Sequence, residues 1–247
     1  MLLYHLYFND ECAKMYQVMN INRNDLLSFL NASLSFSIDE KDEGLEQLFD
    51  KAIDNSKENF IAFYSQLKNV QCVLKEDLKF FMDSDPAASS LDEIKLAYPG
   101  FKAIAIYRIS HIIYKLGYKV HARFFSEIGH SMTGIDIHPA AEIDYPFFID
   151  HGTGIVIGQT SSIGKNVKIY QCVTLGALSL SNAQELRGVV RHPQVGNNVT
   201  IYAGASLLGA ITIGDNVTIG SNVFLTEDVP SNTRVVIGKP ELIIKSK

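Results

Sequence analysis

The segment "VGNNVTIYAGASLLGAITIGDNVTIGSNVFL", Val195 to Leu225, carries an aliphatic residue at every sixth position. A helix spaces its apolar residues three and four apart, and a half-buried strand alternates every two, so neither pattern explains a period of six. Glycine often follows the aliphatic residue directly, and the residue four positions after it is usually small or aliphatic. The spacing therefore predicts short strands joined by tight turns.

The same period occurs earlier in the chain and is interrupted only by two shifts. The positions that keep it are all Ile, Leu or Val: Ile137, Ile143, Ile149, Ile157, Ile163, Ile169, Leu175, Val195, Ile201, Leu207, Ile213, Ile219 and Leu225. This hexapeptide signature is typical of a left-handed parallel β-helix, in which three hexapeptides form one triangular coil and the coils stack. We expect the aliphatic side chains to fill the interior of the prism.

The first half of the chain has a helical period instead. Apolar residues from Phe60 to Leu67 follow the i, i+3, i+4, i+7 pattern. Ser90 stands three residues before Glu93, which predicts a capping box at a helix start. A further helix is expected from Phe101 to Leu116, with Gly117 as its stop.

The two periods divide the chain. We predict an α+β protein with an all-α helical domain over residues 1–132 and a left-handed β-helix over residues 133–247. The interval between Leu175 and Val195 is not a multiple of six. Residues at about 177–192 are therefore predicted to form a loop that extends from a coil, and loops on rigid scaffolds often carry function.

Composition narrows the class of partner and the compartment. The net charge of −5 gives no support for a nucleic-acid partner. Cys12, Cys72 and Cys172 are widely separated, with no spacing that suggests a metal site or a disulfide framework. The first ten residues lack the basic start and apolar run of a signal peptide. The most apolar stretch is interrupted by charges, so we expect no membrane span and a cytoplasmic protein.

An acid and a base interrupt the strand-like run "FFIDHGTGIVIG", Phe147 to Gly158. Because Asp150 and His151 directly follow an inward aliphatic residue, we expect them on the outer surface of the prism. Asp136 lies fifteen residues before His151, which is close to one coil. We therefore predict that Asp136 accepts a hydrogen bond from one imidazole nitrogen and leaves the other free as a base.

The predicted loop ends in another candidate site, the pair Arg191 and His192. Arginine binds carboxylates through its planar fork of donors, so the pair is interpreted as a cationic group for a carboxylate substrate. Cys172 has no neighbour in sequence that would activate its thiol, so it is interpreted as a packed or partly exposed small residue.

Taken together, several of these segments resemble the serine acetyltransferase family. The resemblance is carried by "DPAASSLDEIKLAYPGFKAIAIYRISHIIY", "TGIDIHPAAEI", "FFIDHGTGIVIG", "VTLGA", "RHP" and "IYAGASLLGAITIG", in the family's order, from about Asp83 to Pro240. It implies transfer of acetyl from acetyl-CoA to the hydroxyl of L-serine, with acetyl-CoA as cosubstrate and no metal.

The resemblance also implies a role for each matching residue. His151 is expected to be the general base and Asp136 the residue that orients it. Asp85, Asp150, Arg191 and His192 are expected to hold the amino acid. The cofactor is expected to contact the small residues Gly176, Ala177, Ala203, Gly204 and Ser221.

Partners follow from the same resemblance. L-cysteine, the end product of the pathway, is expected to inhibit. A homotrimer is expected, because Asp150 and His151 would otherwise lack a second wall, and a dimer of trimers paired through the helical domain stays open as the alternative. Many family members bind O-acetylserine sulfhydrylase through a terminal isoleucine, and the tail "IIKSK" of this chain speaks against that partner.

Three alternatives stay open at this point. Another hexapeptide O-acetyltransferase, acting on a sugar or homoserine hydroxyl, would share the fold, CoA and a histidine base. A zinc lyase of the carbonic anhydrase type would use His138, His151 and His192 as ligands. A non-catalytic assembly scaffold would neither bind nor hydrolyse acetyl-CoA.

Overall fold

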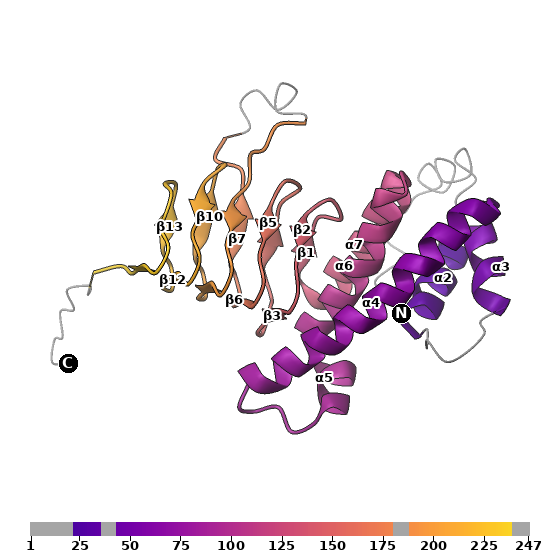
Figure 1. Ribbon diagram of the computed structural model, residues 1–247, viewed down its shortest axis with the longest axis horizontal. Helices are drawn as coiled ribbons and strands as arrows, with labels where there is room; N and C mark the ends of the chain where they lie inside the picture. Colours follow the sequence, from indigo (N-terminus) through magenta and orange to yellow (C-terminus); the bar gives the residue numbers. More distant parts are fainter. Residues whose placement is uncertain (1–21, 36–42, 180–187, 239–247) are drawn as a thin grey trace, which may run out of the picture.

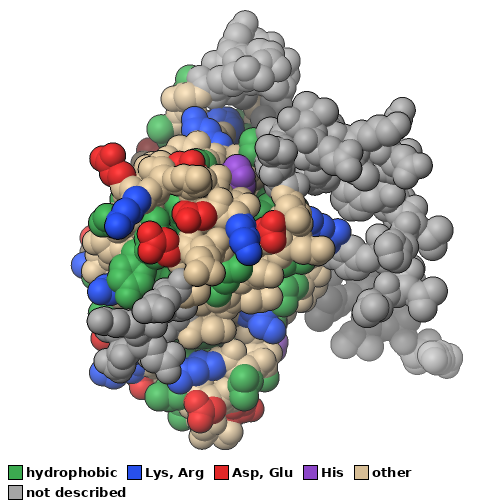
Figure 2. Space-filling view, turned by 90° about the vertical axis from the view of Figure 1, so that its right-hand side faces the viewer, with side chains coloured by type: hydrophobic (Ala, Val, Ile, Leu, Met, Phe, Trp, Pro, Cys, Tyr) green, Lys and Arg blue, Asp and Glu red, His purple; other side chains and the backbone are tan. Residues whose placement is uncertain are grey.

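The computed structural model describes residues 22–35, 43–179 and 188–238. The start of the chain with Cys12, the middle of the predicted loop and the "IIKSK" tail lie outside these residues, so what was predicted for them stays a prediction. Helices occupy one end of the described structure, and the coils of a β-helix extend away from them (Figure 1). On the helical end, acidic and basic side chains are interspersed (Figure 2).

Six described helices precede the β-helix. Their bounds are α2 Arg23–Ser35, α3 Glu43–Ala52, α4 Lys57–Ser84, α5 Leu91–Ala97, α6 Pro99–Lys115 and α7 Lys119–Thr133. Phe29, Phe49, Phe63 and Phe125 pack ring against ring in the core of this part. Among the described residues, no helix is both long and apolar enough to cross a membrane.

Both predicted helices are present, with corrections to the capping box and to the start of the second helix, because α6 begins at Pro99 and not at Phe101. Ser90 Oγ accepts a hydrogen bond from the backbone N–H of Glu93, at 3.1 Å, and so caps α5. The Glu93 carboxylate, however, accepts from the backbone N–H of Ser89, at 2.7 Å, one residue earlier than in a standard capping box. Helix α6 ends at Lys115, followed by Gly117 at φ 97°, a conformation that favours glycine.

The second part is the predicted parallel β-helix. Its strands are β1 Asp136–Ile137, β2 Glu142–Ile143, β3 Phe147–Ile149, β4 Val156–Ile157, β5 Ser162–Ile163, β6 Val167–Ile169, β7 Thr174–Gly176, β8 Gln194–Val195, β9 Thr200–Ile201, β10 Ser206–Leu208, β11 Thr212–Ile213, β12 Thr218–Ile219, β13 Phe224–Leu225 and β14 Arg234–Val235. They form three parallel sheets, ordered β1-β4-β7-β10-β13, β11-β8-β5-β2 and β14-β12-β9-β6-β3. Consecutive strands belong to different sheets, as a triangular coil requires.

The six-residue period fills the interior of the prism. Ile137, Ile157, Leu175, Leu207 and Leu225 are aligned in register along one sheet. All thirteen predicted positions are buried except Leu225, which is partly buried and packs on the same core. The fold class predicted from the sequence is therefore confirmed.

Asparagines stabilise one corner of the prism. Asn166, Asn198, Asn216 and Asn232 all have left-handed backbone conformations, with φ between 57° and 61°. Each of the first three donates from Nδ2 to the Oδ1 of the next asparagine at 3.0 Å. Asparagine tolerates this conformation better than most residues. The asparagines therefore fit the turns, and their side chains hydrogen-bond to one another from coil to coil.

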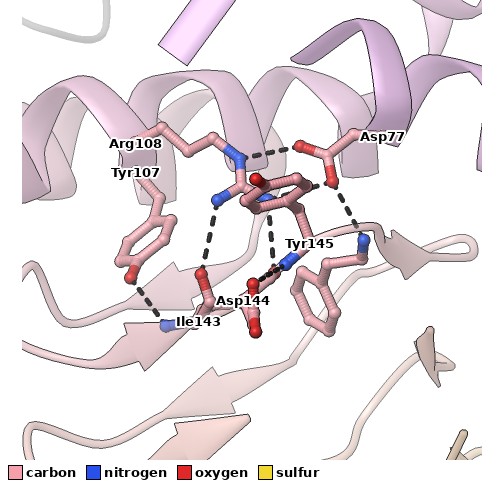
Figure 3. Close-up of polar contacts among 7 residues, drawn as sticks. Asp77, Tyr107, Arg108, Ile143, Asp144 and Tyr145 are labelled. Carbon is pink, nitrogen blue, oxygen red and sulfur yellow. Dashed lines mark hydrogen bonds and ion pairs between the residues drawn. The ribbon is translucent and has the colours of Figure 1, made fainter. Parts of the chain in front are cut away.

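A buried ion pair joins the helices to the first coil (Figure 3). Arg108 on α6 donates from Nε and Nη2 to the two carboxylate oxygens of Asp77 on α4, at 2.7 and 2.9 Å. Asp77 also accepts from the backbone N–H of Phe147, at 2.9 Å. Burial raises the pKa of Asp77, and the guanidinium of Arg108 offsets part of that effect. This contact fixes α4 against β3.

Candidate active site

Two corners of the prism carry the predicted site residues. The His151 corner consists of the turns that lead into the β1 sheet: residues 150–155, 170–173, 202–205 and 220–223. The Thr160 corner consists of the turns that leave the same sheet: residues 138–141, 158–161, the described part of 177–193, and 209–211. The strands of the β1 sheet lie between the two corners.

Asp150 and His151 are adjacent on the His151 corner. Backbone strain marks the position, because His151 has φ 57° although it is not glycine. Its imidazole is 70% exposed, and Nε2 lies 3.8 Å from Asp150 Oδ1. The expectation that both side chains lie on the outer surface agrees with this geometry.

Asp85, at the end of α4, is brought to the same corner. Its Oδ2 accepts from the hydroxyl of Tyr98 at 2.7 Å, and its Oδ1 accepts from the backbone N–H of Ala87 at 2.8 Å. These two hydrogen bonds hold the pKa of Asp85 below its ordinary value, and the nearby charge of His151 lowers it further. The sequence pointed to Asp85 but not to Tyr98.

Asp136 lies on the outward face of β1, the first strand of its sheet. Its Oδ1 is buried and, among the described residues, has no hydrogen-bond partner. The same atom lies 3.7 Å from Nη1 of Arg123 on α7. The described contacts of His151 include Asp150 but not Asp136, so the predicted hydrogen bond between Asp136 and His151 stays a prediction.

Arg191 and His192 lie on the Thr160 corner and not beside His151. The backbone N–H of Arg191 donates to Thr160 Oγ1 at 3.0 Å, and Arg191 Nη2 donates to Gln159 Oε1 at 2.5 Å. The end of the predicted loop is thus tied to the preceding coil.

His192 is held as a neutral ring. The backbone N–H of Thr160 donates to His192 Nδ1 at 3.1 Å, which makes Nδ1 an acceptor and leaves the ring proton on Nε2. Burial, reinforced by the charge of Arg191, lowers the pKa of His192 to about 4. His138, which shares the corner, also has its pKa lowered to about 4, chiefly by burial.

The five residues predicted to contact the cofactor divide between the corners. Ala203, Gly204 and Ser221 lie in successive turns of the His151 corner, and Gly204 has φ 73°. Gly176 ends β7, and Ala177 follows it on the Thr160 corner. All five are at least partly exposed, so ligand access is open to each.

Cys172 occupies a turn position of the His151 corner. Its backbone has φ 61°, and its Sγ lies 3.5 Å from the carbonyl oxygen of Thr153. Gly154 and Gly204 take the corresponding turns of neighbouring coils, with φ 79° and 73°. Cys172 is therefore an exposed turn residue and is not packed in the core.

The three histidines proposed as zinc ligands do not gather within the described part of one chain. The group there whose ligand atoms lie within 4.8 Å of one another is Glu127, His130 and Asp136. Arg123 already pairs with Glu127 and lies 3.7 Å from Asp136. Within one chain the zinc-lyase alternative therefore lacks its ligand set.

A hexapeptide prism with a histidine and carboxylates on an outer corner defines an acyltransferase of the hexapeptide-repeat class. Residues 192–227 match the family described as "Bacterial transferase hexapeptide (six repeats)". A serine acetyltransferase of Synechococcus elongatus is 49% identical over 70% of this chain and 55% of its own length. One from Helicobacter pylori is 41% identical over 70% of this chain and 98% of its own length. The chain belongs to the serine acetyltransferase family.

Solved structures of that family share the fold. Isoform 3 from Entamoeba histolytica, in complex with cysteine, is 35% identical with a TM-score of 0.76, over 90% of this chain and 84% of its own. The Neisseria gonorrhoeae enzyme in complex with serine is 32% identical with a TM-score of 0.68, over 93% and 89%. The Brucella abortus enzyme in complex with coenzyme A is 29% identical with a TM-score of 0.67, over 92% and 86%.

Proposed function

We propose that this chain is a serine O-acetyltransferase. It transfers acetyl from acetyl-CoA to the hydroxyl of L-serine and yields O-acetyl-L-serine and CoA, a step of cysteine biosynthesis. The observation that carries the proposal is the proximity of Asp85, Asp150 and His151, which come from helix α4 and from a turn of the β-helix. Carboxylates beside an exposed imidazole suit a substrate that has both an ammonium group and a hydroxyl.

In this proposal His151 acts as general base. A serine hydroxyl is a weak nucleophile at neutral pH, so a base must take its proton as the oxygen attacks the thioester carbonyl. The proton passes to the imidazole, and CoA leaves as the thiolate when the tetrahedral intermediate collapses. Asp136 is assigned the orienting role, which its buried Oδ1 without a hydrogen-bond partner among the described residues supports.

Acetyl-CoA is proposed as the cosubstrate, with its acetyl group directed toward His151. The backbone amides of Gly176 and Ala177 are candidates for stabilising the oxyanion. Ala203, Gly204 and Ser221 are small residues that would let the cofactor approach the backbone. The Brucella relative with bound coenzyme A supports acetyl-CoA as the cosubstrate.

The groups proposed to bind serine lie on both corners, and a homotrimer would bring them together. Asp85 and Asp150 belong to the His151 corner, whereas Arg191 is hydrogen-bonded on the Thr160 corner. At about 3.3 Å per residue, the strand and turns between the corners span roughly 15–20 Å, too far for one serine molecule. A cyclic trimer would bring the His151 corner of one chain against the Thr160 corner of the next.

L-Cysteine is proposed to compete with L-serine, because both carry the same ammonium and carboxylate groups. The Entamoeba relative in complex with cysteine supports this point. A pairing of two trimers through the helical part is compatible with this arrangement. A complex with O-acetylserine sulfhydrylase is not proposed, since the tail lies outside the described residues.

The experiment that tests the proposal is acetyl-CoA consumption by the purified protein against L-serine, L-homoserine and a panel of sugars. We expect turnover with L-serine and competitive inhibition by L-cysteine. Preferred turnover of homoserine or a sugar would replace the proposal with another hexapeptide O-acetyltransferase. Absence of acetyl-CoA consumption with every acceptor would favour an assembly scaffold.

A further inference from the structure

We propose that Tyr98 is the positioning residue of the serine site, which orients Asp85 toward the ammonium group of the amino-acid substrate. The inference rests on the proposed function and deepens it, because it concerns how the ammonium group is recognised. Tyr98 Oη donates a hydrogen bond of 2.7 Å to Asp85 Oδ2.

The protonation of the pair suits recognition of a cation. The hydrogen bond to Asp85 raises the pKa of Tyr98 to about 12, while the same bond lowers the pKa of Asp85. The proton therefore stays on the phenol, and Asp85 is a carboxylate at neutral pH. Each of its oxygens has one described donor, Tyr98 or the Ala87 amide, which leaves lone pairs for an ammonium group.

The phenol is fixed from several directions. Tyr98 lies between α5 and α6, where its N–H donates to the carbonyl oxygen of Ile94 and its own carbonyl accepts from Lys102. Its ring meets the buried ring of Phe81 edge to face, with centroids 6.3 Å apart. Tyr98 therefore has a defined position relative to the core.

The same core leads to the strand that ends at the catalytic corner. Phe81 packs against Phe148 of β3, with ring centroids 4.7 Å apart. Strand β3 ends at Ile149, directly before Asp150 and His151. Through these contacts Tyr98 fixes the carboxylate of Asp85, which belongs to the helical part, relative to Asp150 and His151 of the β-helix.

A second tyrosine provides a matched control. Tyr118 donates to Asp54 Oδ2 at 2.6 Å, and its pKa is also raised to about 12, chiefly by burial. Asp54 and Tyr118 lie in the helical part and contact Asn59 there. Removing either hydroxyl deletes one tyrosine–carboxylate hydrogen bond, but only Tyr98 serves the proposed site.

The test compares steady-state kinetics of Tyr98→Phe, Tyr118→Phe and Asp85→Asn in the full chain. For Tyr98→Phe we expect the KM for L-serine and the inhibition constant of L-cysteine to rise together by about tenfold, the loss typical of one charge-assisted hydrogen bond. The kcat and the KM for acetyl-CoA should stay within about twofold, since Phe keeps the ring contact with Phe81. Tyr118→Phe should leave all four constants unchanged.

Three results overturn the inference and are distinguishable. An unchanged or lower serine KM in Tyr98→Phe, with a raised one in Asp85→Asn, would reject the role of Tyr98 and leave the proposed site intact. An unchanged serine KM in both variants would also remove Asp85 from the proposed site. A fall in kcat alone, with serine KM unchanged, would likewise contradict a positioning role.

Discussion

The imidazole of His192 lies directly on the backbone of Gly158, from the neighbouring turn of the same corner. A Cβ atom built on Gly158 would come 2.0 Å from Cδ2 of His192 and 2.2 Å from its Nε2. On the other side of the ring, Thr160 Oγ1 lies 2.7 Å from Nδ1. The close approach of the imidazole ring therefore requires glycine at this position.

Gly158→Ala should displace the His192 ring and weaken serine binding. We expect the KM for L-serine to rise by about tenfold or more, with a smaller effect on the KM for acetyl-CoA. Gly238→Ala is the control, because a Cβ at Gly238 would meet nothing within 4 Å. Kinetics of the two variants measure the effect, and equal serine KM values in both would refute the assignment of His192 to the serine site.

His192 and His138 should titrate far below the ordinary range of a histidine. Burial lowers the pKa of each to about 4, compared with an ordinary value of 6.5. Because charging these rings is disfavoured in the folded state, their contribution to stability is complete above pH 6.5 and is lost as the pH falls toward 4. Proton NMR of the ring C–H signals, assigned with His192→Asn and His138→Asn, should give midpoints near 4. Midpoints near 6.5 would contradict the buried, neutral rings.

A site shared between chains predicts complementation. His151→Ala and Arg191→Ala should each be inactive or strongly impaired alone, whereas a co-expressed mixture should recover activity. In randomly mixed trimers, about a quarter of the sites would combine the intact His151 corner of one chain with the intact Thr160 corner of the next.

A second mixture controls for nonspecific rescue. His151→Ala with Asp150→Ala should recover nothing, because both residues lie on the same corner and no interface would be intact. Recovery in neither mixture would indicate a site within one chain, and an active monomer in light scattering would contradict the trimer.

Asp77→Ala should destabilise the protein far more than removal of a surface charge. It leaves Arg108, only 7% exposed, without its carboxylate partner, and such a loss typically costs about 3–5 kcal/mol. Replacing both residues by apolar ones, Asp77→Leu with Arg108→Met, should be less harmful than Asp77→Ala. Asp92→Ala breaks the exposed pair with Lys95 and should cost less than about 0.5 kcal/mol.

Thermal and denaturant unfolding would measure these differences. If Asp77→Ala were as stable as Asp92→Ala, the ion pair would not be the contact that fixes the helices on the first coil.

The sequence predicted the β-helix well, because the six-residue spacing of its aliphatic residues is a local pattern that can be seen directly in the sequence. Ile137 and Leu207, for example, are far apart in sequence but obey the same spacing. The candidate site was predicted only in its separate parts. The Tyr98–Asp85 bond depends on how helix α5 folds back on α4, and the Thr160–His192 bond joins residues on the two sides of the predicted loop. Neither has a periodic signal, and a Thr or Tyr alone suggests no partner.

The most direct test of the account is product analysis with isotopically labelled acetyl-CoA and L-serine. Mass spectrometry should detect labelled O-acetyl-L-serine from the natural protein and from Cys172→Ala, with no acetyl group retained on the protein. His151→Ala should lose turnover by at least about a hundredfold, while calorimetry still detects L-cysteine binding. Undiminished O-acetyl-L-serine formation by His151→Ala, or an acetyl group trapped on Cys172, would contradict direct transfer with His151 as the base.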